Sequence, residues 1–202
     1  MLKSIRLKKD RATARPKPIE GQLILEDGSH YNGIKIGSPN MEIGEVWFNT
    51  SMTGYQEIIT DPSYAGQIIN FTFPHIGNVG TNFDDDESRK PFAKGIIINC
   101  DISDPSNYRS ILHLDMWLKK NNVPGICNID TRLITNKIRS KGAPKGGIIE
   151  GPINRKKTAY CLKEIKKWKG LNGLDLAIDV SRKDVKIYKS KKKSKLKVVA
   201  ID

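Results

Sequence analysis

Apolar and polar residues alternate over several short stretches in the first half of the chain, as in strands that bury one face. The stretch from Gly44 to Thr50 is typical, because Val46 and Phe48 alternate with Trp47 and Asn49. This pattern, with the turn residues between the stretches, predicts strands over residues 22–25, 31–36, 44–50, 67–73, 94–100, 125–128 and 147–150. Asp27-Gly28 between the first two strands predicts a hairpin.

From about Ser110 onward the apolar residues take up the spacing of amphipathic helices. Helices are predicted over residues 110–121, 130–139 and 157–169, with caps at Ser110 or a nearby residue and at Asp130, and a terminator at Gly142. The predicted buried faces carry Leu133, Ile134 and Ile138 in the second helix and Cys161, Leu162, Ile165 and Trp168 in the third. Strands come first and then mix with helices, which favours a layered α/β domain of sheets and flanking helices over a doubly wound one.

A cluster of small hydroxyl residues, Thr50-Ser51-Met52-Thr53-Gly54, follows the strand that begins at Gly44. Its composition and the closing glycine predict a turn. Hydroxyls at the tip of a strand are well placed to meet a polar ligand or a facing domain. The alternative is that Ser51 only satisfies the hydrogen bonds of its own turn.

The formal net charge of +13 is concentrated in two flanking segments. Residues 1–17 carry a net charge of +6 and residues 186–197 a net charge of +7, whereas residues 18–185 carry only +1. A nucleic-acid-binding domain is expected to carry its basic stripe on the fold itself, together with stacking aromatic residues. The flanks therefore predict a solvated extension and a linker, and nucleic-acid binding is the less favoured alternative.

Composition excludes several classes of protein. Hydrophobic residues make up 38% of the chain, its mean hydropathy is -0.47, and no apolar run approaches the roughly 20 residues of a membrane span. The basic amino terminus has no apolar core, which excludes a secretory signal and leaves a transit peptide as the alternative to a solvated extension. We therefore predict a cytoplasmic protein that binds neither membrane nor nucleic acid.

The three cysteines, Cys100, Cys127 and Cys161, are widely spaced and form no metal-binding pattern with the histidines. They are expected to be buried free thiols in a reducing compartment. The glycine-rich stretch from Gly142 to Gly147 lacks the spacing of a phosphate-binding loop, so a helix exit or hairpin is predicted there instead.

Five stretches of the chain form specific motifs: GEVWFNTSMTGYQEIITDPSY from Gly44, FPHIGNVG from Phe73, IDTRLIT from Ile129, GLNGLDLA from Gly170 and KVVAID from Lys197. Together they resemble the amino-terminal half of the small subunit, the glutamine amidotransferase chain, of glutamine-dependent carbamoyl phosphate synthase. Phe73, Ile134 and Lys169 stand where this family usually has Tyr, Leu and Pro. The resemblance extends from about Gly21 to the last residue, apart from the lysine-rich run.

The resemblance implies a swivelling β/β/α domain over residues 21–185, after a basic extension over residues 1–20. It also implies that residues 186–202 are a lysine-rich linker and the first strand of a glutaminase domain, with Val198–Ile201 as a buried strand. In this family the small subunit hydrolyses glutamine with a Cys-His-Glu set in its second domain. The ammonia passes to a large subunit, which makes carbamoyl phosphate from bicarbonate and ATP for pyrimidine and arginine synthesis.

No catalytic residue of the family maps onto this sequence, because no cysteine lies in a Gly-x-Cys-x-Gly pattern and no histidine precedes Pro-Glu. These 202 residues are thus expected to hydrolyse no glutamine alone, to bind no cofactor or metal, and to dock on the large subunit, which holds ATP and metal. One binding residue carries over, since Ser51 matches the serine with which the family's first domain reaches glutamine. Tyr55, Gln56 and Asp61 are expected to be structural or interfacial. The alternative from another class is a non-catalytic interaction module.

Overall fold

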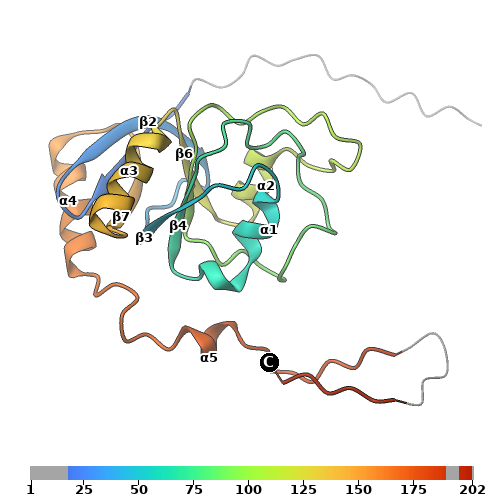
Figure 1. The fold of residues 1–202 in the computed structure, drawn as a ribbon. Helices are drawn as coiled ribbons and strands as arrows, with labels where there is room; N and C mark the ends of the chain where they lie inside the picture. The colour runs from blue at the N-terminus through green and yellow to red at the C-terminus, as the bar shows by residue number, and fades with distance from the viewer. Residues whose placement is uncertain (1–17, 190–195, 202) are drawn as a thin grey trace, which may run out of the picture.

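The computed structural model describes residues 18–189 and 196–201, and its main feature is a closed seven-stranded barrel (Figure 1). The strands are β1 (Glu20–Leu25), β2 (His30–Gly37), β3 (Glu42–Asn49), β4 (Gln67–Phe71), β5 (Gly95–Ile97), β6 (Pro124–Cys127) and β7 (Lys145–Glu150). The remaining elements are α1 (Tyr55–Thr60), the 3-10 helix η1 (Pro62–Tyr64), α2 (Leu114–Lys120), α3 (Thr131–Lys141), α4 (Arg155–Lys167) and α5 (Leu176–Val180).

The barrel is mixed and follows the order β1-β2-β6-β5-β4-β3-β7. The three pairs that join β3, β4, β5 and β6 are parallel, and the other four pairs are antiparallel. Parallel neighbours need crossover connections, and α1 with η1 supplies the one from β3 to β4, while α2 supplies the one from β5 to β6. The turn that contains Ser51 thus lies where β3 leaves the barrel and enters its crossover.

The barrel interior is apolar, and α3 covers it. Every strand except β2 contributes a buried aliphatic side chain to this cluster, and α3 adds Ile134 and Ile138. Asp130 caps α3 by accepting a hydrogen bond from the Leu133 amide at 2.9 Å, and Gly142 ends it with a φ of 85°. The predicted cap and terminator of this helix are confirmed, and the helix extends to Lys141, two residues beyond its predicted end.

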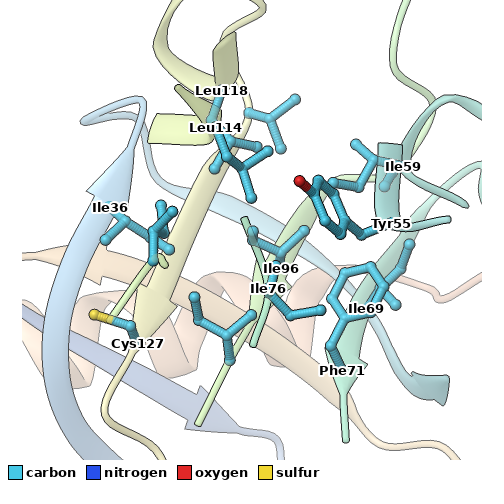
Figure 2. Close-up of a cluster of buried hydrophobic side chains, with 14 of the residues drawn as sticks. Ile36, Tyr55, Ile59, Ile69, Phe71, Ile76, Ile96, Leu114, Leu118 and Cys127 are labelled. Atoms are coloured by element: carbon cyan, nitrogen blue, oxygen red, sulfur yellow. The ribbon is translucent and has the colours of Figure 1, made fainter. Parts of the chain in front are cut away.

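Two further clusters lie outside the barrel, in layers that the helices form on its two sides (Figure 1). Helices α1 and α2 and the long loops enclose the larger one, in which Tyr55, Ile59 and Leu114 pack against Ile69, Phe71 and Ile96 of the barrel (Figure 2). Helix α4 forms the smaller one by placing Cys161 and Ile165 on Ile24 and Ile149. The predicted apolar stripe of this helix is confirmed at its two buried positions.

The predicted mixture of strands and helices is confirmed, including the hairpin at Asp27-Gly28 and the helix exit after Gly142. The flanking helices are as predicted, but the strands do not form separate sheets, because β1 pairs with β7 and β2 with β6, and these pairs close one sheet into a barrel. Alternation along one strand reports its buried face and not its partner, so the sequence pattern could not reveal this closure. The swivelling β/β/α description stays a prediction.

Two local predictions about the helices are wrong. Helix α2 begins at Leu114 with His113 as its cap, because Thr81 pairs with Leu112 and holds the preceding residues extended. Leu133 is 46% exposed, since α3 turns only Ile134 and Ile138 into the barrel. Residues 198–201 are exposed and pair with no strand of the described residues. That they begin a strand of a further domain stays a prediction.

The predicted basic extension falls almost wholly on residues 1–17, outside the described residues. Part of the predicted linker, residues 190–195, also lies outside them.

Candidate functional site

Residues 50–54 form an exposed turn between β3 and α1, as the sequence predicts. Ser51, Met52 and Thr53 are all exposed, and the Met52 side chain is 68% accessible. The Ser51 hydroxyl makes no hydrogen bond with any residue that the structure describes. It does not satisfy its own turn, and is thus free to donate and accept at the protein surface.

The amino-terminal side of the turn is held by Asn49. Its Oδ1 accepts a hydrogen bond from the Ser51 amide at 2.8 Å, which is the geometry of an Asx turn. Its Nδ2 donates to the Tyr64 hydroxyl at 2.9 Å, and its backbone carbonyl accepts from the Thr72 amide at 3.0 Å. The residue before the turn is therefore tied both to the barrel and to the crossover.

The carboxyl-terminal side of the turn is held by α1. Gly54 adopts a φ of 82°, which favours glycine, and its carbonyl accepts the first helical hydrogen bond from the Ile58 amide. The next two residues are buried, and the Tyr55 hydroxyl donates to the Gly80 carbonyl at 2.6 Å, while Gln56 exchanges hydrogen bonds with the backbone of Asn82. Tyr55 and Gln56 are thus structural, as is Asp61, which caps η1.

A hollow of about 220 Å³ lies beside the turn, between α1 and the loops that precede β5 and α2. Its lining includes Thr53, Gly54, Glu57, Asp85, Asn107 and Arg109. Ser51 is not among the lining residues, so the hollow and the free hydroxyl are neighbouring features of one face rather than a single pocket.

The charges around the hollow are partly paired. Arg109 forms an ion pair with Asp85 at 2.5 Å, and this hydrogen bond raises the pKa of the guanidinium. Burial raises the pKa of the Glu57 carboxyl, and the nearby charges of Asp85 and Glu87 add to that shift. The Asp85–Arg109 pair also joins the loop before β5 to the loop before α2, so that the two loops form one wall.

Neither of the two buried thiols is set up as a nucleophile. Burial raises the pKa of Cys127 to about 12 and that of Cys161 to about 11, which is opposite to the shift that an activated thiolate needs. Cys100 is exposed, so its predicted burial is wrong. The apolar run that it follows ends at Ile98, and Cys100 lies in the loop beyond β5.

Within residues 18–189 and 196–201, no cluster of three or more His, Cys, Asp or Glu side chains is arranged to hold a metal ion. No helix in the same residues combines the length and apolar character needed to cross a membrane.

The sequence pointed to Ser51 but not to the residues that hold it. An asparagine two positions before a turn amide is a recognisable signal for an Asx turn, so Asn49 could have been found. Tyr64 could not, because its contact with Asn49 depends on how η1 packs against the end of β3.

Comparisons with known proteins give a consistent picture. The family model described as carbamoyl-phosphate synthase small chain, CPSase domain, matches residues 23–148. The carbamoyl phosphate synthase small chain of Agrobacterium fabrum is 50% identical over 163 residues, which cover 79% of this chain and 41% of that protein. The corresponding protein of Vibrio parahaemolyticus is 47% identical over 167 residues, 83% of this chain and 44% of its own length.

The chain therefore spans about two fifths of the length of the curated relatives it matches. Among solved structures, an aminopeptidase from Aneurinibacillus sp. strain AM-1 matches with a TM-score of 0.36 and 14% identity, over 67% of this chain and 31% of that one. This likeness is too weak to support an argument.

Proposed function

Because the chain belongs to the carbamoyl phosphate synthase small-chain family, we propose that it works as the domain of that chain that docks on the large subunit and presents Ser51 to glutamine. In this proposal the barrel is the family's swivelling β/β/α domain. ATP, bicarbonate and metal bind the large subunit, where ammonia from glutamine is converted to carbamoyl phosphate for pyrimidine and arginine synthesis. The complex works in the cytoplasm.

The observation that carries the glutamine proposal is the free hydroxyl of Ser51 on a turn that is fixed at both ends. A hydroxyl can donate to the carboxylate of an amino acid and accept from its ammonium group. A fixed turn has little conformational freedom left to lose on binding, so more of the contact energy goes into affinity.

The test replaces Ser51 with Ala in the assembled synthase that contains this domain. Loss of one hydrogen bond to a charged ligand, about 1.5–3 kcal/mol, should raise the glutamine KM roughly 10- to 150-fold. Synthesis from free ammonia should be little changed, because it bypasses the glutamine site. Unaltered glutamine kinetics would leave Ser51 as a turn residue only.

Docking is supported by large apolar side chains that are exposed on two joined loops. Phe83 is 79% exposed, Tyr108 94% and Ile111 60%, and they lie on the two loops that the Thr81–Leu112 bridge joins. Exposed apolar patches of this kind are typical of protein–protein contacts. The partner that the family relationship supplies is the large chain of the synthase.

Replacing Tyr108 and Ile111 with Ser should weaken co-purification with the large chain. Replacing Tyr160, which is 58% exposed on α4 on the other side of the barrel, should leave co-purification with the large chain unchanged. A complex of unchanged affinity in the first variant would place the docking surface elsewhere.

A polypeptide of these 202 residues should release no glutamate from glutamine when it is assayed alone. The buried thiols have raised pKa values, so they are protonated at neutral pH. Glutamate release that a thiol reagent abolishes would contradict this expectation, and Cys100 would be the residue to examine because it is exposed.

A further inference from the structure

We propose that Asn49 and Tyr64 are positioning residues that set the conformation in which Ser51 presents its hydroxyl to glutamine. The proposal rests on the function proposed above. It adds two residues to the glutamine site. Asn49 contacts Ser51, Tyr64 contacts Asn49, and neither is proposed to contact glutamine itself.

The contacts form a chain from the core to the surface. The Tyr64 ring packs against the large outer cluster that contains Phe71 and Ile59. Its hydroxyl lies 2.9 Å from Asn49 Nδ2, and Asn49 Oδ1 lies 2.8 Å from the Ser51 amide nitrogen. The side-chain amide of Asn49 thus links the Ser51 backbone to the core through Tyr64.

The orientation of the Asn49 amide follows from its partners. The Ser51 amide can only donate, so the oxygen of Asn49 must face it, and the Nδ2 group must then face the Tyr64 hydroxyl. The backbone carbonyl of Asn49 meanwhile accepts from both the amide and the hydroxyl of Thr72. Asn49 therefore continues the pairing of β3 with β4 through its backbone and forms the turn through its side chain.

The two hydrogen bonds predict different effects for three substitutions. Asp at position 49 keeps an acceptor for the Ser51 amide, and the Tyr64 hydroxyl can turn and donate to its second oxygen, so both contacts survive. Ala at position 49 removes both contacts. Phe at position 64 removes only the contact to Asn49 and leaves the packed ring in place.

The first experiment measures amide hydrogen exchange at Ser51 in the 202-residue chain. Asn49→Ala should speed exchange about tenfold and Tyr64→Phe about threefold, whereas Asn49→Asp should leave it within about twofold of the parent. Tyr160→Phe, at an exposed position on α4, is the matched control and should change nothing. Unchanged exchange in both Asn49→Ala and Tyr64→Phe would overturn the proposal at its structural step.

The second experiment measures glutamine kinetics in the assembled synthase. Asn49→Ala should raise the glutamine KM about tenfold and Tyr64→Phe about threefold, with kcat and ammonia-dependent synthesis little changed. Asn49→Asp should restore a KM within about twofold of the parent. In a Ser51→Ala background neither Asn49→Ala nor Tyr64→Phe should raise KM further, which a general structural role would not predict.

The outcomes separate the two proposals. If Ser51→Ala leaves KM unchanged while exchange at Ser51 responds as expected, the turn is held as described but does not contact glutamine, and the proposed glutamine role falls. If Ser51→Ala raises KM and the Asn49 and Tyr64 variants do not, or if their effects add to that of Ser51→Ala, the positioning role alone is overturned.

Discussion

Two segments rich in small hydroxyl residues behave in opposite ways. In α3, the helix that covers the barrel, the Thr135 hydroxyl donates to the Thr131 carbonyl at 2.8 Å and accepts from Asn70 Nδ2 at 3.0 Å. In the turn of residues 50–54, the Ser51 hydroxyl is exposed and has no partner among the described residues. Both segments belong to stretches with the same family resemblance.

The difference lies in what the hydroxyls satisfy. The α3 segment uses its threonines to pair the buried Nδ2 group of Asn70, which is what a polar donor inside a fold requires. The turn takes its hydrogen bonds from Asn49 and from its own backbone, and so leaves Ser51 available. Residue type therefore does not separate a hydroxyl that is paired inside the fold from one that is left free at the surface, but the hydrogen-bond partners do.

The largest effect is expected where α3 enters the barrel. Ile134 is fully buried, so Ile134→Ala should destabilise the chain by about 2–5 kcal/mol, through lost burial and the cavity left behind. Leu133→Ala is the matched control on the same helix, and it should cost under about 1 kcal/mol because Leu133 is 46% exposed. Denaturant unfolding of the two variants measures both values.

The comparison is sharpest with the same substitution in the two segments. Thr135→Val keeps the shape of the side chain but leaves one N–H of buried Asn70 unpaired, which should cost about 1–3 kcal/mol. Thr53→Val, in the exposed turn, should change the free energy of unfolding by less than about 0.5 kcal/mol. Equal losses at the two positions would contradict the difference between the buried and the exposed segment.

Lys35, a buried cation on β2, is expected to make the stability of the chain depend on pH. Lys35 is 8% exposed, its Nζ donates to the carbonyls of Ile36 and Ser38, and burial lowers its pKa from 10.5 to about 8. Between these two values the unfolded chain holds the proton that the folded chain has released. Stability therefore rises with pH across that window, by at most about 1.4 kcal/mol per pH unit, and the gain is lost again as pH falls to 8.

Lys35→Met should remove this rise, and Lys163→Met, at an exposed position on α4, should not. The raised pKa values of the Cys127 and Cys161 thiols act in the opposite direction, lowering stability as pH rises above about 9. That contribution is common to parent and variant, so the difference between their unfolding free energies isolates Lys35.

The smallest effect on stability is expected at the residue with the largest proposed effect on function. Ser51→Ala should change the free energy of unfolding by less than about 0.5 kcal/mol, because the hydroxyl has no partner to lose among the described residues. A loss above 1 kcal/mol in thermal or denaturant unfolding would mean that the hydroxyl has a structural partner.

The same contrast explains how far the sequence could be interpreted. The boundaries of α3 were predictable because Asp130 and Gly142 act within one turn of the helix they bound. The closure of the barrel was not, since the pairs β1–β7 and β2–β6 join residues about 90 or more positions apart. In the site, Ser51 was found by resemblance, whereas Tyr64 depends on tertiary packing that no local pattern records.

Closure of the barrel also limits how this domain can associate with other chains. Strand addition requires a free edge whose amides and carbonyls await a partner, and in this barrel each of the seven strands has a neighbour on both sides. A docking partner must therefore recognise side chains and loops rather than extend the sheet. Backbone amides of the barrel strands should be equally protected from hydrogen exchange in the free and the assembled domain, while protection changes should concentrate in the loops around residues 50–54, 81–92 and 99–113.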